Sequence, residues 1–144
     1  MRKSVFLPAL CLCIVPMCGA GASAEMARGV VYEDANGNAV REAGEPGIAG
    51  VMVSNGREVV RTGEDGAYEI AVEPGRFVFV VKPRGWMLRV DGEHKPRFFH
   101  HHFPEGSPPL RFGGTGATGP LPASVDFGLV RREEPGYLRV ILFG

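Results

Sequence analysis

Hydrophobic and polar positions alternate with a period of two over short stretches of this chain, and no long stretch repeats apolar residues at helical spacing. Between residues 67 and 72, the large apolar side chains Tyr68, Ile70 and Val72 alternate with small or charged ones. Such alternation is typical of a strand with one buried face. The 21 glycines and 12 prolines interrupt the chain every few residues. The pattern therefore predicts short strands joined by turns.

The same reasoning places further strands along the chain. The segments expected to be extended are Gly29–Glu33, Val51–Ser54, Glu58–Thr62, Ala67–Val72, Phe77–Val81, Trp86–Val90, Phe98–His101 and Val125–Val130. Asn55 and Gly56 favour a type I′ turn, which requires two residues with positive φ, and the continuous apolar run at Phe77–Val81 favours a central strand. The predicted fold is all-β, an immunoglobulin-like or transthyretin-like sandwich of about seven strands.

The N-terminus has the three-part pattern of a secretory signal peptide. Arg2 and Lys3 precede an apolar run from Val5 to Cys18, and the small residues 22–24 follow it. The run of about 14 residues is too short for a membrane span, which needs about 20, so we expect cleavage after Ala24. The residues before Cys18 do not resemble a lipoprotein signal, and we expect no contact with a membrane apart from export.

Removal of residues 1–24 changes the charge and the cysteine content. All three cysteines lie in that segment, so disulfides are excluded as a source of stability. The remaining 14 basic and 16 acidic residues give a net charge of −2, which does not favour nucleic acid as a partner. The expected organisation is a signal peptide at 1–24, one sandwich at 25–130 and, at 131–144, a polar linker followed by a further apolar strand. The expected location is secreted or periplasmic.

The strongest chemical signal is an oxygen-rich loop after the first predicted strand. Counting from Asp34, side-chain oxygens fall at positions one, three, five, nine and twelve, the register of a loop that wraps a calcium ion. The candidate ligands are Asp34, Asn36, Asn38, the carbonyl of Val40, Glu42 and Glu45. Calcium prefers six to eight oxygen ligands, and three of these side chains are negatively charged.

Two features of this loop differ from an ordinary EF-hand. Ala39 stands where that motif has glycine at position six, and no amphipathic helix flanks the loop. The alternative is an ion-free polar loop in which Asn and Asp side chains accept hydrogen bonds from their own backbone. The sequence leaves both interpretations open.

Other motifs do not indicate a catalytic site. His100, His101 and His102 cannot all reach one metal ion from a strand, because adjacent side chains point to opposite faces. With His94 upstream and phenylalanines on both sides, they predict a packed aromatic strand with exposed imidazoles. The segment Gly114–Gly119 matches a dinucleotide-binding fingerprint but lacks the strand and helix that give it meaning, so we expect a loop. We expect no cofactor other than calcium and no catalysis by this chain alone.

Two groups of segments together resemble a known family. The first comprises Gly29-Val-Val-Tyr-Glu-Asp34-Ala-Asn-Gly-Asn38, Glu45-Pro-Gly-Ile-Ala-Gly50-Val-Met-Val-Ser-Asn-Gly56, Thr62 and Gly66-Ala-Tyr68; the second comprises Phe98-Phe-His100, Pro104-Glu-Gly106-Ser-Pro108 and Thr118-Gly-Pro-Leu-Pro122-Ala-Ser-Val-Asp126-Phe. The first group is also similar to calcium-binding adhesin B repeats and to carboxypeptidase regulatory-like domains. With the second group, residues 27–129 resemble the N-terminal domain of secreted calcineurin-like phosphoesterases.

This resemblance implies an accessory role beside a catalytic domain. In such proteins a following α/β domain binds two divalent metals that activate water against a phosphate ester. The segment Tyr137–Phe143 resembles the first strand of that domain, and the chain stops where a metal-binding Asp would come. The expected partner is therefore the missing catalytic domain, and the divalent metals would be bound only there. The substrate is unknown. The alternative is a self-standing, calcium-stabilised extracellular binding module.

Overall fold

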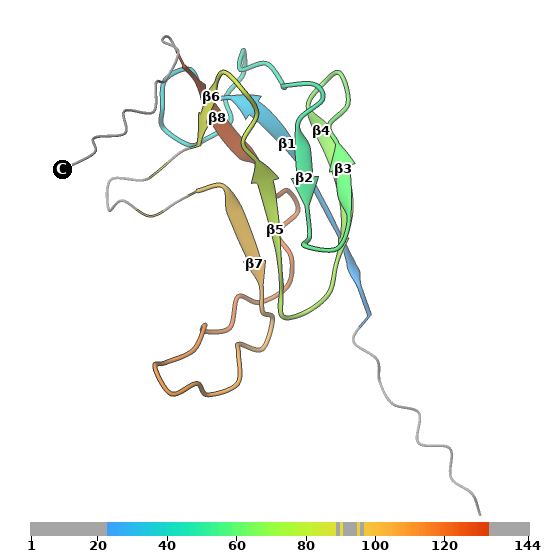
Figure 1. Ribbon diagram of the computed structural model, residues 1–144, viewed down its shortest axis with the longest axis vertical. Helices are drawn as coiled ribbons and strands as arrows, with labels where there is room; N and C mark the ends of the chain where they lie inside the picture. The colour runs from blue at the N-terminus through green and yellow to red at the C-terminus, as the bar shows by residue number, and fades with distance from the viewer. Residues whose placement is uncertain (1–22, 89, 91–94, 96, 133–144) are drawn as a thin grey trace, which may run out of the picture.

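The computed structural model describes residues 23–88, 90, 95 and 97–132, which fold as two facing β-sheets (Figure 1). The strands are β1 (Glu25–Glu33), β2 (Met52–Ser54), β3 (Val59–Arg61), β4 (Ala67–Val72), β5 (Arg76–Val81), β6 (Trp86–Leu88), β7 (Phe99–His102) and β8 (Phe127–Arg131). One sheet has the order β4-β1-β8-β6 and the other β3-β2-β5-β7. The predicted all-β sandwich is confirmed, with eight strands in the part of the chain that the structure describes. In the described residues no helix is long and apolar enough to cross a membrane.

Strand β1 holds the first sheet together by pairing with different partners along its length. Residues 25–30 pair antiparallel with β4, and residues 31–33 pair parallel with β8. Where β1 changes partner, the Val30 amide donates to Asp126 Oδ1 at 2.8 Å, and the Val125 amide donates to the Arg28 carbonyl at 2.8 Å. The segment before β8 thus satisfies backbone groups that would otherwise lack partners.

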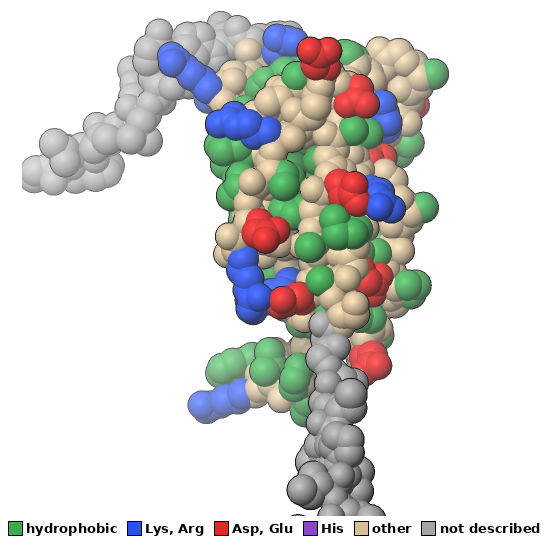
Figure 2. Space-filling view, turned by 90° about the vertical axis from the view of Figure 1, so that its right-hand side faces the viewer, with side chains coloured by type: hydrophobic (Ala, Val, Ile, Leu, Met, Phe, Trp, Pro, Cys, Tyr) green, Lys and Arg blue, Asp and Glu red, His purple; other side chains and the backbone are tan. Residues whose placement is uncertain are grey.

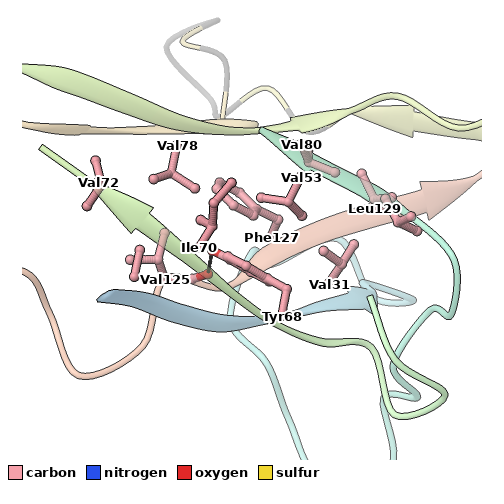
Figure 3. Packing of buried hydrophobic residues seen from close by; sticks show 12 residues of the cluster. Val31, Val53, Tyr68, Ile70, Val72, Val78, Val80, Val125, Phe127 and Leu129 are labelled. Carbon is pink, nitrogen blue, oxygen red and sulfur yellow. Dashed lines mark hydrogen bonds between the residues drawn. The ribbon is translucent and has the colours of Figure 1, made fainter. Parts of the chain in front are cut away.

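The core lies between the two sheets and consists mainly of β-branched and aromatic side chains (Figure 3). Tyr68, Ile70 and Val72 are all buried, which confirms the alternation read from the sequence. The Tyr68 hydroxyl donates to the Val125 carbonyl at 2.6 Å inside the core. Burial and then the nearby Asp126 carboxylate raise the pKa of Tyr68 well above its usual value, so the hydroxyl keeps its proton. The buried polar group is therefore satisfied.

The predicted type I′ turn at Asn55 and Gly56 is wrong. Ser54 pairs with Val59, so four residues connect β2 to β3, and Gly56 has a positive φ of 85° whereas Asn55 does not. The Asn55 side chain gives the physical reason. Its Oδ1 accepts hydrogen bonds from the amides of Arg57 and Glu58, at 2.8 and 2.7 Å, and so stabilises a wider turn.

Strand β5 is internal, between β2 and β7, as predicted, but only one of its faces is buried. Val78 and Val80 are buried against the other sheet, whereas Phe77 is 45% exposed. A continuous apolar run in sequence therefore does not mark burial on both faces here. The outward side chains of β5 and β7 instead pack on each other, with Phe77 in edge contact with Phe99 and Phe103.

The C-terminal end of β8 is anchored by Arg131. Its guanidinium lies 4.7 Å from the centre of the Trp86 ring and donates two hydrogen bonds to the Glu33 carboxylate, at 3.1 and 3.0 Å. These hydrogen bonds lower the pKa of Glu33. The Arg132 amide also donates to the Gly85 carbonyl at 2.9 Å, so the sandwich extends to residue 132. The predicted strand at Tyr137–Phe143 lies outside the described residues.

Candidate functional site

The oxygen-rich loop begins directly at the end of β1. Asp34 is fully buried, and its amide donates to the Leu129 carbonyl of β8 at 2.9 Å. Gly128 provides the space beside it, since a Cβ added at Gly128 would lie 3.0 Å from the Asp34 Cβ. Asp34 Oδ2 accepts a hydrogen bond from the Ala39 amide at 3.1 Å and so turns the loop back on itself. The first candidate ligand is therefore fixed by two strands of the sandwich.

The two asparagines shape the middle of the loop. Asn36 Oδ1 accepts from the Asn38 amide at 2.9 Å, and Asn38 Oδ1 accepts from the Val40 amide at 2.8 Å. Two successive side-chain-to-backbone turns result. These are the bonds expected of the ion-free interpretation, although a carbonyl oxygen has a second lone pair with which it can also face a cation.

The two glutamates close the loop. The Glu42 carboxylate accepts from the side-chain amides of Asn36 and Asn38, at 2.7 and 3.0 Å. Glu45 accepts from the backbone amides of Ala35 and Glu42, at 3.2 and 3.1 Å. Hydrogen bonds thus join Asn36, Asn38, Glu42 and Glu45 to one another, and the fifth candidate, Asp34, binds the backbone of the same loop at Ala39. The sixth, Val40, enters through its backbone, and its side chain is exposed.

These contacts leave the choice between the two interpretations open. Within the described residues, no three His, Cys, Asp or Glu side chains are placed so that they could hold a metal ion together. The candidate set for calcium, however, also includes two amide oxygens and a backbone carbonyl. Ion binding by this loop stays a prediction, and it is taken up below.

Ala39 is the only non-glycine residue with a positive φ, 61°, in the described chain. Because an L-residue in this conformation is strained by its Cβ, we predict that Ala39→Gly raises the free energy of unfolding by about 0.5–1 kcal/mol, the strain relief exceeding the added flexibility of the unfolded chain. Urea denaturation measures this change. Ala43→Gly in the same loop is the control and should not stabilise. A destabilised Ala39→Gly protein would contradict the prediction.

The histidines of β7 alternate between faces, as predicted, but their imidazoles are less exposed than expected. His102 is fully buried, and its Nε2 lies 3.3 Å from Glu25 Oε1 at the start of β1. His100 is partly buried on the same face, and its desolvation, together with His101 and His102, lowers its pKa. The expectation of exposed imidazoles is wrong for His102, because its side chain is enclosed on the inner face of β7 and reaches Glu25 of the other sheet. His94 lies outside the described residues.

Comparison with known proteins now settles the family. The sequence profile described as the N-terminal of calcineurin-like phosphoesterase matches residues 34–113, more than half of the chain. The chain belongs to this family. The matched residues of this MetallophosN domain run from the oxygen-rich loop past β7, while β1 and β8, which complete the first sheet, lie outside the match. No curated protein matches the chain.

Sequence reasoning missed the part played by Asp126. In the sequence it stands out only as part of the family resemblance, yet its Oδ1 accepts from both the Val30 amide and the Ser124 hydroxyl, at 2.8 and 2.6 Å. Nothing in its local sequence indicates a partner 96 residues away. The segment Gly114–Gly119, by contrast, lies in an irregular loop, as predicted.

Proposed function

We propose that this chain is the non-catalytic accessory domain of a secreted or periplasmic calcineurin-like phosphoesterase. The observation that carries the proposal is the family match over residues 34–113, within a sandwich that has its own core. The N-terminal pattern of positive charge, apolar run and small residues supports export. Phosphate ester hydrolysis, and the divalent metals that it requires, belong to the catalytic domain of the parent protein.

The carboxylates of the sandwich support an accessory role. Asp126 holds the β1 backbone, Glu33 binds Arg131, and Glu42 and Glu45 close the oxygen-rich loop. A general acid or base must instead be free to reach a substrate proton. These four carboxylates are thus engaged in structural contacts.

Two measurements test this proposal. Transcript sequencing past the codon for Gly144 should show a frame that continues into the catalytic domain, beginning with the metal-binding Asp. The isolated chain should not hydrolyse p-nitrophenyl phosphate in the presence of Mn²⁺, because the dimetal ligands lie in that following domain. Turnover by the isolated chain that is lost on substituting His100 and His101, with the fold intact, would overturn the accessory role.

A second candidate function is a self-standing module stabilised by calcium. What favours it is the convergence of Asp34, Asn36, Asn38, Glu42 and Glu45 in one hydrogen-bonded loop, anchored by a buried aspartate. An ion at this position would link the end of β1 to the rest of the loop. Binding of the ion would raise the free energy of unfolding, because the unfolded chain does not hold the ligands together.

Calcium should therefore raise the melting temperature of the chain. At a calcium concentration a hundred times the dissociation constant, the expected stabilisation is about 2.7 kcal/mol, or roughly 10 °C for a domain of this size. Glu42→Gln should weaken the effect, and Glu64→Gln, an exposed residue outside the loop, should leave it unchanged. A melting temperature that does not respond to calcium would remove this candidate and leave the accessory role untouched.

A further inference from the structure

A loop between β7 and β8 projects beyond the sandwich and presents apolar side chains to solvent. We call residues 104–117 the finger. Leu110 is 63% exposed and Phe112 is 92% exposed, and the Arg111 guanidinium lies 5.2 Å from the centre of the Phe112 ring. Figure 2 shows the finger as a hydrophobic projection with a basic side chain at its far end, below the body of the molecule. Exposed apolar side chains that gather in one patch are a common feature of interaction surfaces.

The finger is held in one conformation by its own hydrogen bonds. At its base, the Thr118 amide donates to the Phe103 carbonyl at 2.8 Å, and the Phe103 amide donates to Thr118 Oγ1 at 3.0 Å. Ser107 and Thr115 bond each other across the middle, and the Gly113 amide closes the tip on the Leu110 carbonyl at 3.1 Å. A tip that is already ordered loses little entropy on binding.

A pocket that complements the tip lies beside the base of the finger. It has a volume of about 500 Å³, and its walls include Pro74 from the turn before β5 and Phe103, Pro104 and Pro108 from the finger base. Glu105 also lines it and is exposed. The pocket is therefore apolar with one negative charge, whereas the tip is apolar with one positive charge.

The charges of the tip and the pocket are opposite in sign, and both belong to exposed side chains. Among the described residues, neither Arg111 nor Glu105 forms an ion pair, although five other ion pairs are present. The finger and the turn before β5, which lines the pocket, lie at the same end of the molecule, the lower end of the sandwich in Figure 1. A two-fold axis at that end would bring each tip to the pocket of the other copy. Such a contact is isologous, so the assembly stops at a dimer.

We propose that a second copy of this chain docks here, with Leu110 and Phe112 of each copy in the other's pocket and Arg111 paired with Glu105 across the axis. Aromatic residues and arginine are both enriched at protein interfaces. A membrane surface fits less well, since lipid binding by a short apolar tip requires several basic residues, and the finger has one.

Sedimentation equilibrium of the exported chain tests the proposal. We expect a dimer at micromolar concentration, and Phe112→Ser should raise its dissociation constant at least tenfold, the size of effect found at interface centres. Met87→Ser, a change at a 49% exposed residue on β6 at the other end, should leave it unchanged. Arg111→Glu and Glu105→Arg should each weaken the dimer, and the double variant should restore it.

Three results would overturn the proposal. The first is a chain that remains monomeric up to the highest soluble concentration. The second is an association that Phe112→Ser leaves unchanged, which would point to another contact such as strand pairing. The third is a monomer that binds phosphatidylglycerol vesicles through Phe112, which would assign the finger to a membrane surface. Because Phe112 is exposed, its substitution should not prevent folding, and circular dichroism checks this.

Discussion

Replacement of Gly29 by alanine should destabilise the sandwich by about 3 kcal/mol, the upper part of the range for overpacking. A Cβ at this position would lie 1.9 Å from the Val125 carbonyl oxygen, an atom of the backbone that cannot rotate away. The segment before β8 would have to move. It would then lose the hydrogen bonds that its backbone makes with Arg28 and with the Tyr68 hydroxyl. Urea denaturation followed by tryptophan fluorescence measures the change.

Gly116→Ala is the matched control for this substitution. Gly116 has a negative φ, and a Cβ there would meet no atom within 4 Å. Its effect should stay within about 0.5 kcal/mol, as for other surface substitutions. If Gly29→Ala were as mild as the control, the close contact between β1 and the segment before β8 would be wrong.

Truncation of Phe127 to alanine should lower the free energy of unfolding by about 3–5 kcal/mol, the usual range for a buried aromatic side chain. Phe127 is 2% exposed in β8, and its ring stacks against that of Tyr68 with centres 6.0 Å apart. Its removal would leave a cavity between the sheets that the close-packed neighbours cannot fill. Since domains of this size are stable by about 5–15 kcal/mol, the variant should show a much lower midpoint of urea denaturation.

Phe112→Ala makes the same chemical change at an exposed position. At submicromolar protein concentration, where association does not contribute, this variant should unfold like the unmodified chain. If both substitutions lowered the free energy of unfolding by a similar amount, β8 would not complete the core. A large cost at Phe127 alone would show that the folded unit extends beyond the segment matched by the family profile.

That result would define the bounds of the folded domain. The profile matches residues 34–113, yet the first sheet requires β1 before this segment and β8 after it. Asp126, Val125 and Arg131 all bind residues of β1. An accessory domain cut at the profile boundaries would lack two of the four strands of one sheet, so expression of residues 25–132 is the better choice.

The sequence alone determined the class of fold and most of its elements. Alternation at Tyr68, Ile70 and Val72 identified β4, and all three side chains are buried as predicted. The family resemblance was also visible in local segments, because turn glycines and loop carboxylates keep fixed spacings that local backbone geometry requires. The oxygen-rich loop is recognisable for the same reason, since its hydrogen bonds join residues no more than ten positions from each other in sequence. The one exception is the bond from the Asp34 amide to Leu129.

Only the tertiary structure decided features that depend on distant residues. Three such features join segments more than 70 positions apart. They are the parallel pairing of β1 with β8, the hydrogen bond from Val30 to Asp126, and the contact of the buried His102 with the start of β1. No local pattern encodes such pairings, because they follow from which surfaces the whole chain can bury together. For the same reason, the exposed tip of the finger and its neighbouring pocket could be recognised only in three dimensions.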